Sequence, residues 1–337
     1  MNDESLKSLC LLSNSRKNIN QSNWTIMVYS LGKYIKEYGF CPSFLPILIY
    51  TDHGPSLTTN VVAPHELINN CPVQFYHNHR LVEEFKKLSK KPCYTMYSPS
   101  VYYRRKNKIE ANKDAKGTIV FPSHSTKLID NLMNWDGYID QLKNLPEKFQ
   151  PISICFHMSD IEKNLHKLFL EKGFDVYTAG NIYDERFAER FYDILRKFKY
   201  SSSNLIGSYT FYSVEMGIPF FLFGNSPIYH NHGDPNIEKG NYCSYKSQDI
   251  YMELERMFSE ASDQVTDDQK KYIEEALGLY HGISRIKMAF ILYYSFIVYM
   301  IKSRFFIKSF IKKFLKILKN FTRPVRRKIV KILWKTK

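Results

Sequence analysis

The second half of the chain alternates short apolar runs with helical periods, and this alternation constrains the fold more than any other feature. The apolar runs predict strands at residues 118–121, 151–156, 174–177, 204–206 and 218–223. Helical periods follow at residues 161–172, 184–198 and 209–216, and a further helix is expected to run from a loop at 122–126 to about residue 145. Strands that alternate with helices in this way predict a parallel sheet covered on both faces.

The first third of the chain has a looser version of the same pattern. A helical period covers residues 24–38, strands are expected at 46–50 and 93–96, and a charged helix at 78–91. The wholly polar stretch 104–116 is typical of a domain edge. The predicted fold class is therefore α/β, with two Rossmann-like domains and a C-terminal basic amphipathic helical tail. The predicted divisions are a flexible N-terminus (1–22), a first domain (23–110), a second domain (111–275) and the tail helices (276–337).

The tail carries the excess charge of the whole chain. The net charge is +15, no Asp or Glu follows Glu275, and sixteen Lys and Arg lie between Ala276 and Lys337. Apolar residues recur at three- and four-residue steps over 305–321 with lysines between them, which predicts a helix lying flat on an anionic membrane surface. Residues 288–301 are nearly uncharged, but as a helix they reach only about 21 Å of a hydrocarbon core of roughly 30 Å.

Two other interpretations of the tail stay open. One is a helix packed on the protein core and followed by a solvated basic arm. The other is an arm that binds nucleic acid, which the apolar Phe and Ile faces disfavour because phosphates do not need them. The six cysteines form no CxxC pair and the N-terminus lacks a signal-peptide pattern, so reduced thiols in the cytoplasm are expected.

Small polar residues gather in the loops that follow the predicted strands, where parallel sheets bind ligands. Ser123, His124, Ser125 and Thr126 follow one strand and are expected to open a helix, which favours a phosphate cradle over a simple helix cap. Residues 201–208 offer a second anion site, with Ser203, Asn204, Gly207 and Ser208 as candidate ligands. Glu215, two turns further on, is a candidate for a ribose diol, and a solvated helix face is the alternative.

Two further loops carry candidate residues. Thr178, Gly180 and Asn181 lie in a small-residue loop that is suited either to reading a nucleobase or to an ordinary turn. In the first domain, Asp52 and His53 end a strand and are candidates for a base that deprotonates an acceptor hydroxyl, although an isolated histidine is often structural.

The sequence favours a site without a metal. His230 and His232, like His77 and His79, are spaced i,i+2 and lack a third anchored ligand. An Asp-x-Asp pair at the end of an apolar strand, which would hold a metal beside a nucleotide sugar, is also missing.

Three segments resemble a known family. GTIVFPSHST at 117–126, DERFAERFYDIL at 184–195 and SNLIGSYTFYSVEMGIPFF at 203–221 resemble the C-terminal half of GT-B glycosyltransferases, above all bacterial capsule and lipopolysaccharide enzymes. The resemblance covers about 105 residues (117–221) and implies a nucleotide-sugar donor. It implies phosphate contacts from Ser123, His124, Ser125, Ser203 and Ser208, and a nucleoside contact from Glu215. TDHG at 51–54 is similar to acceptor-side motifs and implies a catalytic base at His53 or Asp52.

Together these features predict transfer of a sugar from a nucleotide sugar to a lipid-linked or polysaccharide acceptor, without cofactor, metal or nucleic acid. The expected location is the cytoplasmic face of a bacterial inner membrane, bound peripherally through residues 302–337. A nucleotide-sugar epimerase, a polyol-phosphate transferase and a non-enzymatic membrane scaffold are the alternatives. The prediction depends on two helix N-termini, entered through 121–126 and 205–209, that face one crevice.

Overall fold

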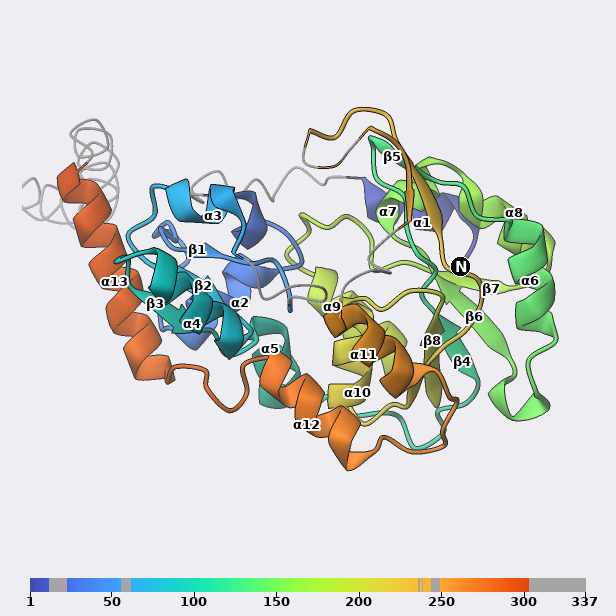
Figure 1. Ribbon diagram of the computed structural model, residues 1–337. Helices are drawn as coiled ribbons and strands as arrows, with labels where there is room; N and C mark the ends of the chain where they lie inside the picture. The colour runs from blue at the N-terminus through green and yellow to red at the C-terminus, as the bar shows by residue number, and fades with distance from the viewer. Residues whose placement is uncertain (12–22, 56–61, 236, 238, 244–248, 303–337) are drawn as a thin grey trace, which may run out of the picture.

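The computed structural model describes residues 1–11, 23–55, 62–235, 237, 239–243 and 249–302, and Figure 1 shows their arrangement. Among these residues the strands form three sheets. The first sheet is parallel, with the order β1-β2-β3, and consists of β1 (Tyr50–Thr51), β2 (Gln74–Tyr76) and β3 (Cys93–Thr95). Helices α2 (Leu31–Tyr38), α3 (Pro64–Ile68) and α4 (His79–Leu88) belong to the same part of the chain.

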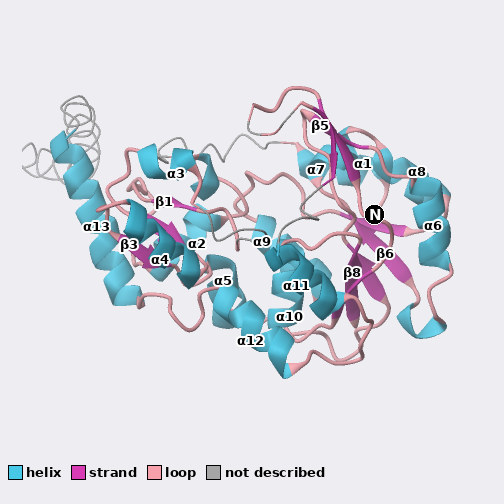
Figure 2. Cartoon of the chain, in the orientation of Figure 1, coloured by secondary structure: helices cyan, strands magenta, loops and turns pink. Residues whose placement is uncertain are grey.

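The second sheet is the parallel sheet that the sequence predicts. Its strands are β4 (Thr118–Val120), β6 (Ile152–Cys155), β7 (Asp175–Tyr177), β8 (Tyr200–Ser203) and β9 (Phe220–Leu222), in the order β7-β6-β4-β8-β9. The helices between these strands are α6 (Trp135–Lys143), α7 (Met158–Glu162), α8 (Leu165–Glu171), α9 (Phe187–Leu195) and α10 (Ser208–Glu215). Figure 2 shows these helices around the five strands. The expected α/β class with parallel sheets is therefore confirmed.

The strand order places a topological switch between β4 and β8. From β4 the chain moves outward to β6 and β7, and then returns to the other side of β4 to form β8 and β9. The loops after β4 and β8 therefore diverge above the sheet and leave a crevice between them. Open α/β sheets bind ligands in the crevice at such a switch point. Residues 121–128 and 204–207 form these two loops.

A third sheet contradicts part of the prediction. The loop after β4 does not open a helix, because β5 (Ile129–Asn131) follows it and pairs antiparallel with β10 (Ile228–Asn231), which pairs in turn with β11 (Gly240–Cys243). Helix α6 begins only at Trp135. The partner of β5 lies about a hundred residues away in the chain, so local periodicity does not reveal it. The prediction of a strand at 204–206 is also wrong. The strand at this point, β8, ends at Ser203 and consists of Tyr200 and three serines.

The N-terminus is another correction. Residues 1–22 were expected to be flexible, yet helix α1 (Asp3–Cys10) begins at an Asn2 cap and buries Leu6 and Cys10. The amino group of Met1 donates to the carbonyl of Val176, 2.9 Å away, which places α1 on the second sheet's part of the molecule. The remaining residues of that segment, 12–22, lie outside the described residues.

The chain finally returns to the first sheet. Helices α11 (Asp249–Phe258) and α12 (Asp267–Ala276) lead to α13 (Arg285–Lys302), which packs against α2. Met288, Ile291 and Leu292 join the core of Ile35, Ile49 and Phe75 there. No described helix is long and apolar enough to cross a membrane. Helix α13 fits the interpretation of a core-packing helix, whereas the rest of the predicted tail, 303–337, lies outside the described residues.

Candidate active site

The loop after β1 meets the loops of the second sheet. A β-carbon placed on Gly54 would lie 3.9 Å from the β-carbon of Ser208, the first residue of α10. The rings of His53 and Trp24 are tilted by 43° with centroids 4.9 Å apart, and His124 is among the groups that lower the pKa of His53. Residues from the ends of β1 and β4 and from the start of α10 thus lie in one region of the molecule.

His53 is an exposed ring in crowded surroundings. Desolvation by the surrounding protein lowers its pKa, Asp52 raises it, and His77 and His124 lower it further. The side chain is open to water on one side and lies against protein atoms on the other. A histidine with a lowered pKa is neutral at neutral pH and can accept a proton from a hydroxyl.

Asp52 has a different role from the one predicted. Its carboxylate accepts hydrogen bonds from Nδ1 of His77 at 2.6 Å and from the backbone N–H of His77 at 3.2 Å. His77 itself is fully buried at the end of β2. Since both oxygens of Asp52 are occupied, Asp52 fixes the β1 loop against β2, and His53 remains the candidate base.

His124 is half-buried and is held by its neighbours. Its Nδ1 donates to the carbonyl of Ser125 at 2.9 Å, which leaves Nε2 of the neutral ring as an acceptor. The ring stacks on His157, with centroids 4.2 Å apart. His157 caps α7 by accepting the backbone N–H of Ser159 at 3.2 Å, and burial together with His124 lowers its pKa well below the ordinary value.

The hydroxyls of the β4 loop are mostly structural. Ser123 is buried, its N–H donates to the Asn204 side chain at 2.8 Å, and its hydroxyl accepts from Asn204 and Asn131. Ser125 is also buried and donates its N–H to Asp160 at 3.0 Å. Half-buried Thr126 accepts from the N–H of Leu128. Because no helix starts in this loop, the predicted phosphate cradle of Ser123 and Ser125 is wrong in the described structure. The side chain of Asn204 instead joins the β4 and β8 loops.

The start of α10 is more accessible than the serines of the β4 loop. Gly207 occupies the cap position and Ser208 begins the helix with an exposed side chain toward Gly54. An N-terminus of a helix favours negative charge, because its backbone N–H groups and the helix dipole point outward. Ser203, by contrast, is fully buried and shares a hydrogen bond with the hydroxyl of Tyr209 at 2.8 Å.

The loop of Thr178, Gly180 and Asn181 is covered by the N-terminal helix. A β-carbon on Gly180 would lie 2.6 Å from the carbonyl oxygen of Leu9. Asn181 donates its backbone N–H to that carbonyl at 3.0 Å and its side-chain amide to the carbonyl of Cys10 at 2.7 Å. Thr178 is buried and accepts the N–H of Gly180. The predicted nucleobase contact is therefore replaced by a contact with α1.

Glu215 is also not open to a ribose. Its carboxylate is fully buried and is bound by Arg104 through Nε at 2.7 Å and Nη2 at 2.6 Å, and by Nε of Arg105 at 2.9 Å. Both arginines belong to α5 (Pro99–Lys106), in the polar stretch that the sequence analysis regarded as a domain edge. The ion pairs hold the end of α10 to the connection between the two parallel sheets.

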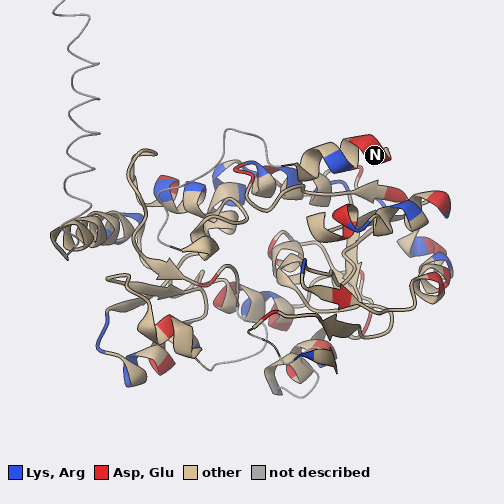
Figure 3. Cartoon of the chain, turned by 90° about the horizontal axis from the view of Figure 1, so that it is seen from above, with Lys and Arg blue, Asp and Glu red and all other residues tan. Residues whose placement is uncertain are grey.

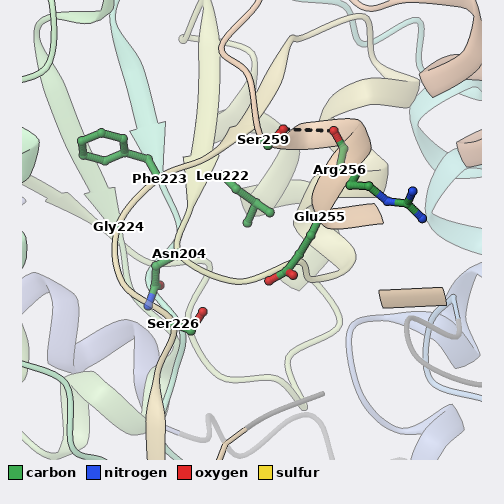
Figure 4. Close-up of a pocket in the computed structure, with 8 residues that line it drawn as sticks. All are labelled: Asn204, Leu222, Phe223, Gly224, Ser226, Glu255, Arg256 and Ser259. Carbon is green, nitrogen blue, oxygen red and sulfur yellow. Dashed lines mark hydrogen bonds between the residues drawn. The ribbon is translucent and has the colours of Figure 1, made fainter. Parts of the chain in front are cut away.

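A cavity of about 400 Å³ lies beside the switch. Figure 4 shows its wall at the carboxyl ends of β8 and β9 and on α11. The lining residues are Asn204, Leu222, Phe223, Gly224, Ser226, Glu255, Arg256 and Ser259. Apart from Asn204, sequence reasoning missed these residues, because α11 reaches them from a distant part of the chain.

The histidine pairs form no metal site in the part of the chain that the structure describes. His232 instead pairs with Asp130 at 2.6 Å, and His230 with the side chain of Asn241 at 2.6 Å. His79 stacks on His281, with centroids 4.4 Å apart. These contacts give each histidine a structural partner.

The geometry defines an α/β protein in which loops from two parallel sheets meet over a topological switch. No family model matches the chain, and no curated protein matches it. Among solved structures it is similar to one of the wall teichoic acid polymerase TagF, with 13% sequence identity and a TM-score of 0.32. The match covers 68% of this chain and 57% of that one, so the chain spans little more than half of the structure that it matches.

Proposed function

We propose that the chain is a glycosyltransferase that moves a sugar from a nucleotide sugar to a hydroxyl acceptor. One observation carries the proposal. The β1 loop, which carries the exposed His53, meets the exposed start of α10, where Gly54 lies against Ser208. A base on one side and an anion-binding helix start on the other are the two groups that sugar transfer from a diphosphate needs.

The reaction follows from this placement. Neutral His53 takes the proton of the acceptor hydroxyl, and the acceptor oxygen attacks the anomeric carbon. The bond from that carbon to the phosphate oxygen breaks on the opposite side, so the configuration inverts. Backbone N–H groups and the hydroxyl at Ser208 receive the negative charge of the departing nucleotide. We assign no metal to this step, and the proton on His53 passes to water after product release.

The cavity beside β8 and β9 is the proposed place for the nucleoside. It borders the β8 loop through Asn204, and Phe223 offers an aromatic edge while Ser226, Glu255 and Arg256 offer polar groups. This position replaces the loop of Thr178 and Asn181, which α1 covers.

A nucleotide screen tests the proposal. Uridine, cytidine and guanosine diphosphates or monophosphates, and their sugar conjugates, are added to the full chain, and the unfolding temperature is recorded. We expect one nucleotide to raise it by several degrees at a concentration well above its Kd. No shift with any nucleotide would favour the scaffold alternative. Product analysis with labelled nucleotide sugars separates sugar transfer from epimerisation and from transfer of a polyol phosphate.

The acceptor and the location belong to the same proposal. We propose a lipid-linked or polysaccharide acceptor at the cytoplasmic face of a bacterial inner membrane, with residues 302–337 as a peripheral anchor. Sixteen cations without an acidic residue after Glu275 support an anionic surface as the partner. Deletion of 303–337 is expected to weaken sedimentation of the protein with anionic vesicles, and unchanged sedimentation would contradict the anchor.

A further inference from the structure

Helix α13 has apolar side chains on opposite faces. One face, with Met288, Ile291 and Leu292, is buried in the core of the first sheet. The other face is open to solvent, with Phe290 73% exposed, Ile286 66% and Ile301 70%. Tyr293, Tyr294 and Ile297 are exposed between them. The exposed side chains recur at three- and four-residue steps and therefore form one continuous stripe along the helix.

The protein holds this stripe in a fixed orientation. Arg285 donates to the carbonyls of Tyr38 and Glu37 at the end of α2, at 3.1 and 3.2 Å. The hydroxyl of Tyr293 donates to the carbonyl of Phe40 at 3.2 Å. A β-carbon on Gly39 would lie 2.6 Å from Cδ1 of Leu292, so the glycine permits α13 to approach this closely. The stripe is thus presented by a docked helix.

The charges around the stripe indicate the kind of partner. Helix α13 contains Arg285, Lys287 and Lys302 and no acidic residue, and the chain beyond it is strongly basic. Figure 3 shows no acidic residue on α13. The exposed ring of Phe40 lies against the guanidinium of Arg285, 4.1 Å from the ring centroid, and so places an aromatic side chain next to a cation beside the stripe. Apolar and tyrosine side chains bordered by cations match the boundary between anionic headgroups and acyl chains.

We infer that the exposed face of α13 docks on an anionic lipid surface, with the helix axis parallel to the membrane. The eighteen residues of α13 extend about 27 Å, which gives a line of contact rather than a span. Ile286, Phe290 and Ile297 enter the boundary region while Met288, Ile291 and Leu292 remain in the core. The inference concerns a different surface from the proposed active site and does not depend on the transfer reaction.

Flotation of the full chain with vesicles tests the inference. Wild type and the double variant Phe290→Gln/Ile297→Gln are compared on vesicles of phosphatidylcholine with phosphatidylglycerol and on phosphatidylcholine alone. We expect wild type to prefer the anionic vesicles, and the double variant to lose about tenfold or more of its partition coefficient, since two apolar side chains no longer leave water. Both substitutions are at exposed helical positions, so the unfolding temperature should not change.

Ile68→Gln is the matched control, because Ile68 is 79% exposed and belongs to a different helix, α3. Its partition coefficient should equal that of wild type. A second measurement separates insertion from attraction by charge alone: Trp introduced by Phe290→Trp should be quenched by brominated lipids, and Trp introduced by Ile68→Trp should not.

Three results would overturn the inference. They are absence of binding to anionic vesicles, unchanged binding by the double variant, and a dimer of wild type in light scattering that the double variant converts to a monomer. The second would assign binding to the basic tail alone, and the third would make the stripe an interface between two copies of the chain.

Discussion

The two parallel sheets use the polar residues at their strand ends differently. In the first sheet, Asp52 and His77 bind each other and leave the ring of His53 exposed. In the second sheet, Ser123, Asn204 and Ser203 are buried and bonded within the protein, and mainly Ser208 and His124 face outward. A loop rich in small polar residues is therefore weak evidence for a ligand site, because the same residues join neighbouring loops.

The strongest test of this comparison is His53→Ala. If the first sheet supplies the reactive group, turnover should fall by about 10²- to 10⁴-fold, the usual contribution of a general base. Nucleotide-induced thermal shifts should persist, because the donor loops are untouched. Exposed His65, on α3, provides the matched control His65→Ala, which should retain turnover. Full activity of the His53 variant in a steady-state assay would show that the first sheet does not supply the reactive group.

Glu215→Gln tests whether the second sheet uses this carboxylate as scaffolding. Arg104 would remain buried without its anion, so we expect a loss of about 3–5 kcal/mol in the free energy of unfolding. Glu84→Gln, which affects an exposed pair with Lys87, should cost less than about 1 kcal/mol. Urea denaturation measures both. A stable Glu215 variant that loses nucleotide binding would return Glu215 to the donor site.

Asn204→Ala tests the bond between the two loops of the second sheet. The buried N–H of Ser123 would lose its acceptor, and we expect the free energy of unfolding to fall by about 2 kcal/mol. The side chain of Asn107 is exposed and donates a hydrogen bond to the nearby carbonyl of Tyr103. Asn107→Ala should therefore change the free energy of unfolding by no more than about 0.5 kcal/mol. Equal stabilities in denaturant titrations would contradict the structural role of Asn204.

The smallest effect is a difference in pH dependence. Burial lowers the pKa of His157, so the unfolded chain takes up a proton that the folded protein does not, and stability is lost as the pH falls below the ordinary histidine pKa. His157→Asn keeps an acceptor for the N–H of Ser159 and removes the titrating group. Between pH 6.5 and 5 the free energy of unfolding should fall less steeply in the variant than in wild type. The difference between the two slopes should approach about 1.4 kcal/mol per pH unit. If denaturant titrations gave wild type and variant the same dependence of unfolding free energy on pH, the predicted contribution of His157 would be contradicted.

Local patterns predicted much of the fold. The apolar strands at 118–121, 151–156, 174–177 and 218–223 appear as β4, β6, β7 and β9 within a few residues. The helix expected at 209–216 appears as α10. These elements carry their signal in neighbouring residues, because burial of a strand or a helix face imposes a short period on the sequence.

Distant pairings were not predictable in the same way. Strand β5 gains its partner from residues 228–231, and the helical period at 24–38 is interrupted at Tyr29 and Ser30, which take positive φ values. In the candidate site, strand-end position singled out His53 in the first domain and Ser208 in the second. The sequence contained no sign that Arg104 would bind Glu215 or that α1 would cover Asn181, since both contacts join residues more than a hundred positions apart.

The anchored end of α10 has a consequence for motion. Arg104 and Arg105 tie Glu215 to the connection between the sheets, which makes α5 a natural pivot for any rotation that widens the junction. Farther from that pivot, Tyr29 donates its N–H to Ile182 at 2.7 Å and Lys33 pairs with Glu189 at 2.6 Å. A rotation about α5 that separated the two sheets would therefore have to break the Tyr29–Ile182 hydrogen bond and the Lys33–Glu189 ion pair.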